Sequence, residues 1–239
     1  MKEEICRQCL GLPCRKEIHR GLKEVVHKEY GRSYLTYAEC EYVRAERLNK
    51  KSRLAGIPGR YATKSFDDYI ATDANRDAIA ISRWYIVERP HEWLYITGGC
   101  GTGKTFLASL IGKEYLRGGH EVIFTDFPSL LEELKSSFDD KAVTADSVLE
   151  KYLTCEMLIL DDVGTGFFRD WGVAVLHQLI NGRYNAELRT IITSNYDLAG
   201  LQSRLSMQEE YAAARIISRL KEMSEVVYMG EEDWRNGIK

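Results

Sequence analysis

The chain has 239 residues, of which 44% are hydrophobic and 29% are charged. This composition supports a sizeable hydrophobic core plus a small additional domain, and it excludes a disordered protein. The net charge is −3, but residues 1–60 hold 14 Lys or Arg against 8 Asp or Glu, which leaves 19 against 28 for the remainder. A basic N-terminal part suits nucleic acid or an acidic partner.

No apolar run approaches the ~20 residues that a membrane-spanning helix needs. Residues 1–7 also lack the apolar region of a signal peptide. We therefore expect a soluble, cytoplasmic protein with no membrane partner.

Four of the six cysteines lie within the first 40 residues: Cys6, Cys9, Cys14 and Cys40. Four thiolates suffice for a tetrahedral Zn²⁺ site, which would organise a small domain that lacks a full core. His19 and His27 are alternative ligands in place of Cys14, and unligated core cysteines are the alternative for the whole cluster. Between the ligands, residues 17–28 are basic and partly apolar, and we predict a helix there, either partner-facing or simply solvated.

Gly, Pro and Gly between residues 53 and 60 interrupt regular structure, so we place a boundary between a zinc-binding domain, 1–54, and a second domain, 55–239. Beyond it, short apolar runs alternate with segments of helical periodicity. The predicted strands are residues 93–97, 122–125, 157–160, 190–193 and 226–228, and the predicted helices are residues 106–116, 129–138, 145–154, 171–187 and 208–222. This alternation predicts an α/β domain with a mostly parallel sheet covered by helices on both faces.

A glycine-rich segment between the first strand and the first helix fits the phosphate-loop pattern Gly-x4-Gly-Lys-Thr. It consists of Gly98, Gly99, Cys100, Gly101, Thr102, Gly103, Lys104 and Thr105, and Phe106 follows as a further cofactor-binding candidate. Glycines let backbone N–H groups wrap around phosphates, and the helix adds its positive N-terminus. Lys104 should reach the β and γ phosphates and Thr105 should bind Mg²⁺. The alternative is a glycine-rich turn with an incidental lysine.

Two of the later predicted strands are followed by polar side chains. Asp161 and Asp162 follow an apolar run, which suits a first acid that orients Mg²⁺ and a second that polarises the attacking water. Asn195 ends the next strand, and a parallel sheet would place it beside the phosphate site, where it could touch the γ-phosphate or the water. The alternatives are a solvated strand end for the two acids and an ordinary turn residue for Asn195.

Two arginines lie further along the chain. Arg215 and Arg219 are four residues apart, and therefore lie on one face of the predicted helix 208–222. Taken alone, such a pair is a solvated basic stripe.

Together, the motifs at residues 98–105, 158–162, 193–195 and 215–220 resemble, in order and spacing, the AAA+ ATPases of the DnaC and DnaI helicase-loader family. The resemblance extends from about Ile57 to the C-terminal end. It implies an AAA+ P-loop NTPase fold, with ATP and Mg²⁺ as cofactors. It also implies that the C-terminal helical lid of most AAA+ proteins is lacking.

In that family, the four motifs are Walker A, Walker B, sensor I and the arginine finger. Carried over, Asn195 is sensor I, Arg219 is the finger offered to a neighbouring subunit's ATP in a role that Arg215 could share, and Arg235 stands at the sensor II position of some members. Asp162 departs from the Glu of most AAA+ proteins. Because the shorter acid would set the water farther back, the resemblance predicts slow hydrolysis.

The resemblance also implies partners. The zinc-binding domain would bind a replicative DNA helicase, the ATPase domain would bind single-stranded DNA, and ATP would drive self-association. The predicted function is therefore an ATP-dependent loader that delivers or releases a helicase during DNA replication. The alternatives are an IstB-like transposition ATPase, a P-loop small-molecule kinase, and a nucleotide-sensing adaptor with almost no turnover.

Overall fold

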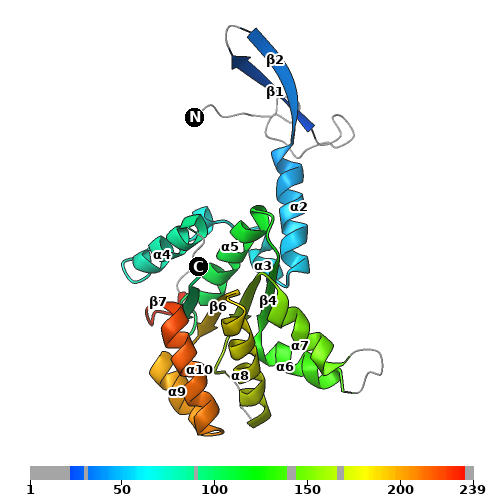
Figure 1. Ribbon diagram of the computed structural model, residues 1–239. Coiled ribbons are helices and arrows are strands. Elements are labelled where there is room, and N and C mark those ends of the chain that lie inside the picture. The colour runs from blue at the N-terminus through cyan, green and yellow to red at the C-terminus, as the bar shows by residue number, and fades with distance from the viewer. Residues whose placement is uncertain (1–21, 30–31, 89–90, 139–143, 166–169, 235–239) are drawn as a thin grey trace. The chain divides into compact units, whose positions relative to one another are not determined.

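The computed structural model describes residues 22–29, 32–88, 91–138, 144–165 and 170–234 (Figure 1). The chain divides into two compact units, residues 1–51 and residues 52–239. None of the helices in the described ranges has the length and apolar character needed to cross a membrane.

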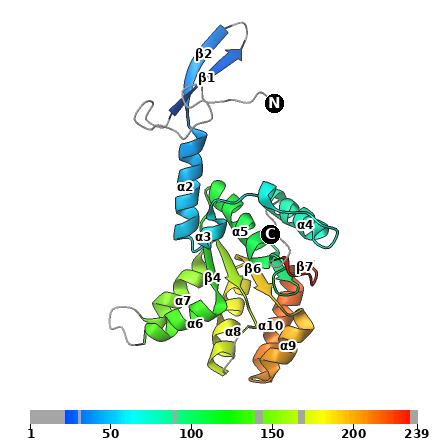
Figure 2. The same cartoon turned by 180° about the vertical axis from the view of Figure 1, so that it is seen from behind.

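An antiparallel hairpin forms the described part of the first unit, together with the start of a helix (Figures 1 and 2). β1 (Leu22–Glu29) pairs with β2 (Arg32–Glu39) along its whole length. α2 (Glu41–Leu54) follows and crosses the division between the units. The helix predicted for residues 17–28 is therefore wrong over residues 22–28. β-branched residues favour extended backbone, and cross-strand pairing with residues 32–39 stabilises it, which periodicity within one segment could not show.

The zinc prediction falls largely outside the described residues. Among the named ligands, Cys6, Cys9, Cys14 and His19 precede residue 22, and only Cys40 has a described side chain. Cys40 is 2% exposed. Within the described ranges, no group of three or more His, Cys, Asp or Glu is placed to hold a metal ion. Zinc binding therefore stays a prediction.

A five-stranded parallel sheet forms the centre of the second unit. In spatial order its strands are β4 (Val122–Asp126), β5 (Met157–Asp161), β6 (Arg189–Ser194), β3 (Trp93–Thr97) and β7 (Ser224–Tyr228). Every neighbouring pair is parallel. The predicted α/β fold with a parallel sheet is confirmed.

The helices of this unit separate the strands along the chain. They are α3 (Gly59–Ala62), η1 (Phe66–Asp68), α4 (Arg76–Glu88), α5 (Lys104–Arg117), α6 (Phe127–Ser136), α7 (Ala145–Thr154), α8 (Asp170–Asn185), α9 (Leu198–Ser206) and α10 (Glu210–Met223). The five predicted helices are confirmed as α5, α6, α7, α8 and α10. α4 and α9 were not among the predicted helices.

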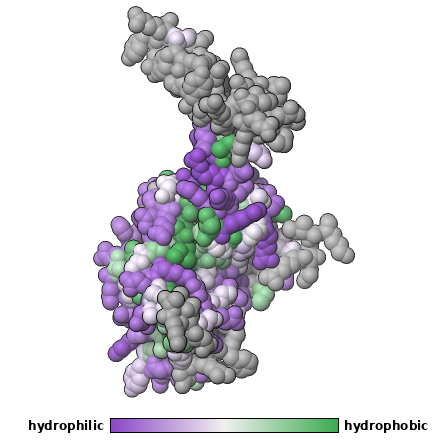
Figure 3. All heavy atoms as spheres, turned by 90° about the vertical axis from the view of Figure 1, so that its right-hand side faces the viewer, coloured by the Kyte–Doolittle hydropathy of each residue, from purple (hydrophilic) through white to green (hydrophobic). Residues whose placement is uncertain are grey.

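Helices cover both faces of the sheet (Figures 1 and 2). Leu158 and Leu160 of β5 belong to the buried core that α6 to α10 line. Ile159 faces the other way, toward α5, where a Cβ at Gly112 would lie 2.7 Å from its Cδ1 atom. The missing side chain at Gly112 therefore lets α5 pack closely on the sheet. On the face shown in Figure 3, hydrophilic residues predominate and a smaller hydrophobic area lies among them.

The strand order positions the functional groups. β6 lies between β3, which leads into the phosphate loop, and β5, which ends in the two acids. Because neighbouring parallel strands run in one direction, their carboxyl ends meet at the same edge of the sheet.

Candidate nucleotide-binding site

A cavity of about 540 Å³ lies at the edge where β3, β5 and β6 end. Nine of the predicted site residues line it together: Cys100, Gly101, Gly103, Lys104, Thr105, Phe106, Asp161, Asp162 and Asn195. The structure therefore brings the phosphate loop, the acid pair and the polar end of β6 into one site, although each role remains a prediction.

Positions 101 and 103 of the phosphate loop require glycine. Gly101 and Gly103 have φ angles of 80° and 94°, which only glycine adopts readily. A Cβ at Gly101 would also lie 1.9 Å from Asp233 Oδ1. Gly103 is the N-cap of α5 and has no side chain to cap it. Backbone N–H groups at the start of α5 thus remain to bind an anion, and the helix dipole favours negative charge there.

The Lys104 ammonium group faces back onto the loop. Its Nζ atom donates hydrogen bonds to the carbonyl oxygens of Gly98 and Gly99, at 2.8 and 2.6 Å. Burial lowers the pKa of Lys104, and nearby negative groups, including Asp161 and Asp162, oppose that effect. A flexible cation over a cradle of N–H groups is what a triphosphate requires.

Asp161 and Thr105 form a pair of oxygen ligands suited to Mg²⁺. The Thr105 hydroxyl donates to both carboxylate oxygens of Asp161, at 3.1 and 3.0 Å. Asp161 is buried, and burial raises its pKa, while hydrogen bonds from Thr193 and Thr105 oppose the rise. A carboxylate and a hydroxyl from adjacent elements match the preference of Mg²⁺ for oxygen ligands beside a phosphate.

Asp162 has an unusual backbone conformation. Its φ angle is 61°, in the left-handed region that residues other than glycine rarely adopt. Its carboxylate accepts a hydrogen bond from Thr165 Oγ1 at 3.0 Å and lines the cavity. The predicted water-polarising acid is therefore adjacent to the phosphate loop, on a turn that stores strain.

Thr193 is a site residue that the sequence analysis did not single out. Its hydroxyl donates to Asp161 Oδ1 at 2.5 Å and accepts from the backbone N–H of Asp162 at 2.9 Å. A threonine at the end of an apolar strand carries no distinctive sequence signal, because threonine is a common strand residue. Asn195 lies two residues further and lines the cavity, half-buried.

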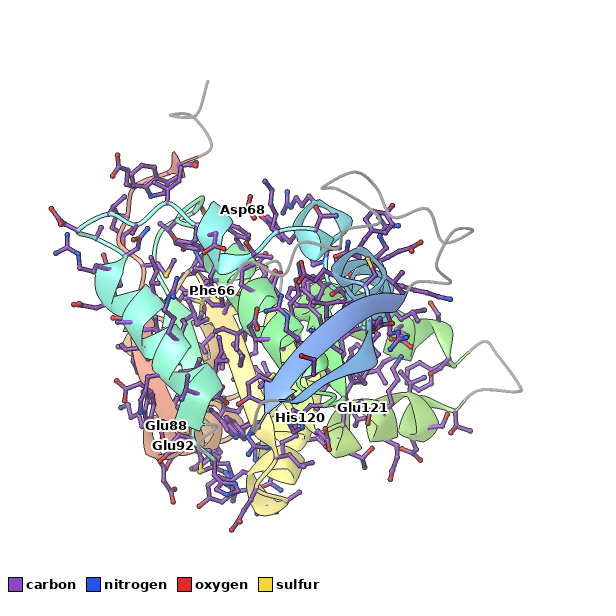
Figure 4. All side chains as sticks on the ribbon, turned by 90° about the horizontal axis from the view of Figure 1, so that it is seen from above. Phe66, Asp68, Glu88, Glu92, His120 and Glu121 are labelled. Carbon is purple, nitrogen blue, oxygen red and sulfur yellow. The ribbon has the colours of Figure 1, made fainter. Side chains whose placement is uncertain are left out.

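A second, mostly apolar cavity of about 110 Å³ adjoins the phosphate loop. The rings of Tyr61, Phe106 and Tyr69 stack beside the loop, with centroid separations of 5.0 and 5.2 Å from Phe106. Tyr69 and Phe106 line the small cavity, and Tyr69 follows the η1 helix, on which Phe66 and Asp68 are labelled in Figure 4. Among the described residues, the buried Tyr69 hydroxyl has no hydrogen-bond partner. The cavity thus offers an aromatic surface with one unused polar group.

Residues 229–234 lie against the phosphate loop. Gly99 donates its N–H to the Gly230 carbonyl at 2.8 Å, and Trp234 donates its N–H to the Gly101 carbonyl at 3.2 Å. Trp234 lines both the large and the small cavity. Trp234 is a further site residue that the sequence motifs did not single out, although its neighbour in the chain is Arg235, the sensor II candidate.

Arg215 and Arg219 line neither cavity. Arg215 is exposed on α10, and Arg219 lies over the Tyr184 ring of α8, with 5.3 Å between Cζ and the ring centroid. Arg235, the sensor II candidate, lies outside the described residues. Arg219 therefore does not border the cavity formed by its own chain.

Comparisons with known proteins agree with this architecture. The family described as "IstB-like ATP binding protein" matches residues 33–239. The chain is 25% identical over 185 residues to the replicative helicase loader DnaC of Buchnera aphidicola from Acyrthosiphon pisum, a match that covers 73% of this chain and 72% of that protein.

Two solved structures are also similar. A crystal structure of the DnaC helicase loader has a TM-score of 0.62 and 29% identity, over 72% of this chain and 99% of that one. A crystal structure of DnaI has a TM-score of 0.63 and 27% identity, over 72% of this chain and 93% of that one. The resemblance to DnaC and DnaI that the motifs predict is confirmed.

Proposed function

Because this chain belongs to the family of IstB-like ATP-binding proteins, we propose that it is an ATP-dependent loader of a replicative DNA helicase. The observation that carries the proposal is the match to the DnaC helicase loader over about three quarters of both chains. The cavity at the phosphate loop supports it, since loading of this kind requires a nucleotide site with groups for hydrolysis.

ATP would occupy the two adjoining cavities. The triphosphate would lie in the large one, held by the N–H groups of the phosphate loop and the start of α5, with Lys104 turning from Gly98 and Gly99 toward the β and γ phosphates. The adenine would enter the apolar cavity, where Phe106, Tyr69 and Trp234 offer aromatic surface. The unpartnered Tyr69 hydroxyl would hydrogen-bond the base or ribose.

Thr105 and Asp161 would hold Mg²⁺, directly or through its water shell, and the ion would neutralise charge on the phosphates. Asp162 would accept a proton from the attacking water, and Asn195 would orient that water or the γ-phosphate. The short Asp162 side chain, held by Thr165, supports slow turnover.

A neighbouring subunit would complete the site. Arg219, with Arg215 as the second candidate, lies outside its own cavity, which supports a role toward the nucleotide of the next copy. The N-terminal region, with its predicted zinc site, would bind the helicase, and the ATPase unit would bind single-stranded DNA.

A loading assay tests this function. The helicase of the same organism is incubated with circular single-stranded DNA, with and without this protein and ATP, and DNA-bound helicase is measured. ATP-dependent stimulation by the wild type, absent for Lys104→Ala, is expected. Unchanged helicase binding would contradict the loader function.

The rival functions have their own readouts. Stimulation of strand transfer by a transposase, without helicase loading, would indicate the transposition ATPase. Transfer of radiolabelled phosphate from ATP to a small molecule would indicate a kinase. ATP binding without any turnover, even with helicase and DNA present, would indicate the adaptor.

A further inference from the structure

Thr193 connects the two acids of the proposed site. It lies near the end of β6 and is 1% exposed. Its hydroxyl has one proton, which it donates to Asp161 Oδ1 at 2.5 Å, and it accepts the backbone N–H of Asp162 at 2.9 Å. One buried hydroxyl therefore contacts both consecutive acids from the neighbouring strand.

The turn that carries the acids is held by β6 at further points. The Thr193 carbonyl accepts the N–H of Val163 at 2.9 Å, and the Ser194 hydroxyl donates to the Val163 carbonyl at 2.6 Å. Asp162, in between, has the left-handed φ of 61°. A residue in this conformation persists only where its surroundings fix it. The end of β6 provides that support.

We propose that Thr193 is a positioning residue that holds Asp161 and Asp162 in register with the phosphate loop. The Thr193 hydroxyl approaches Asp161 from β6, while Thr105 approaches it from α5. The Asp161 carboxylate is thus oriented between two hydroxyls, toward the side where Thr105 would share Mg²⁺. The inference rests on the proposed ATP site, whose cavity Thr193 also lines, and it assigns to Thr193 a role that acts through the two acids.

The role of Thr193 also links the acids to Asn195. Thr193 lies near the end of β6, Asn195 directly follows the strand, and Asn195 lines the cavity. A displacement of this strand end would therefore move Asn195, proposed to lie beside the γ-phosphate, together with the Thr193 hydroxyl that contacts both acids. Hydrogen-bond partners of metal ligands act in this way, and their removal typically costs roughly 10- to 100-fold in metal affinity or activity.

The test compares Thr193→Val, which keeps the shape and removes the hydroxyl, with Thr193→Ser, which keeps the hydroxyl. Thr97→Val is the matched control. Thr97 is a buried threonine on β3 whose hydroxyl donates to the Tyr196 carbonyl at 2.9 Å, and that carbonyl keeps a second donor, Tyr95. Affinity for a fluorescent ATP analogue is measured without metal and across a Mg²⁺ titration, together with ATPase activity.

For Thr193→Val we expect nucleotide affinity without metal within about twofold of wild type. The Mg²⁺ concentration for half-maximal binding or turnover should rise roughly 10-fold or more. Thr193→Ser should need a Mg²⁺ concentration close to that of wild type. Thr97→Val should need the same Mg²⁺ concentration as wild type. If circular dichroism shows that Thr193→Val does not fold, Thr193→Ala replaces it, with the same expected shift.

A wild-type Mg²⁺ dependence in Thr193→Val, or a defect in Thr193→Ser as large as that in Thr193→Val, would overturn the positioning role and leave the ATP site intact. Failure of the wild-type protein to bind ATP at all would instead overturn the proposed function, and the role of Thr193 with it. The two failures are therefore distinguishable in one set of titrations.

Discussion

The guanidinium group of Arg219 lies over the ring of Tyr184, with 5.3 Å between Cζ and the ring centroid. Tyr184 donates its hydroxyl to Glu222 at 2.9 Å, and Arg219 donates to the Arg215 carbonyl at 3.3 Å. Among the described residues, the buried Arg219 Nε atom has no hydrogen-bond partner. Arg219 thus lies against an aromatic ring, with its Nε donor buried and the side chain as a whole half-buried.

Arg219→Ala should bind ATP as well as wild type yet lose roughly 10³-fold or more in turnover, because its guanidinium would contact the γ-phosphate of the next subunit. Steady-state ATPase assays with helicase and single-stranded DNA measure the loss. Mixing Arg219→Ala with Asp162→Asn should restore part of the activity, since a mixed interface can pair an intact acid with an intact arginine. Wild-type turnover in Arg219→Ala alone would make it an ordinary surface residue.

Lys104→Ala should abolish ATP binding while the fold survives, because the lysine hydrogen-bonds only to the phosphate loop's own carbonyls at Gly98 and Gly99 among the contacts described. Equilibrium titration measures binding, and thermal unfolding checks the fold. The exposed Lys135→Ala on α6 is the control and should bind ATP normally. Wild-type affinity in Lys104→Ala would contradict the phosphate-loop assignment.

Trp234→Ala should weaken ATP binding by roughly 1–3 kcal/mol, the usual contribution of an aromatic ring stacked on a base. Its affinity for inorganic triphosphate should fall less, because the ring would stack on the base in the small cavity and only borders the large one. Isothermal titration with both ligands separates the two effects. Trp84→Ala on α4, where Trp84 is 47% exposed and lines neither cavity, is the matched control. Equal losses for ATP and triphosphate would show that Trp234 supports the loop rather than the base.

Arg183 should be essential for stability. It is fully buried on α8, and its guanidinium donates to the carbonyls of Tyr152, Cys155 and Arg189 at 2.7, 3.0 and 2.6 Å. Arg183→Met would leave these buried acceptors without their donor, so we expect a loss of roughly 3–5 kcal/mol in the free energy of unfolding. Urea denaturation measures it.

The control for Arg183 is Arg76→Ala. Arg76 forms an ion pair with Asp73 at 2.6 Å, with side chains 73% and 94% exposed. Such exposed pairs contribute about 0–1 kcal/mol. A similar effect for both substitutions would show that the buried hydrogen bonds of Arg183 add little.

Chelation should release about one zinc per chain and unfold residues 1–50 selectively, because thiolates rather than an apolar core are predicted to stabilise that region. Elemental analysis before and after chelation measures the released zinc. ATP titration before and after chelation checks that the unfolding is selective, because the ATP site should be unaffected. Cys6→Ser should lose the metal, whereas Cys100→Ser, in the phosphate loop, should retain it. Purified wild-type protein without zinc would refute the site and leave the ATP site unaffected.

The features of this protein that can be predicted from the sequence are those whose signals are contiguous. The phosphate loop at residues 98–105 and the apolar run ending in Asp161 and Asp162 each lie within a few residues, because local backbone conformation and local chemistry dictate them. Short apolar runs likewise indicated all five strands of the sheet, and the three central strands β3, β5 and β6 are buried along almost their whole length, as coverage of both faces requires.

Tertiary structure alone decided what depends on distant pairing. Strand order placed β6 between β3 and β5, and thereby put Thr193 against both acids. The apolar cavity joins Tyr69, Phe106 and Trp234 from three separate segments. Residues 22–29 form a strand because residues 32–39 pair with them. In each case the deciding energy comes from contacts between segments, which the periodicity of one segment does not record.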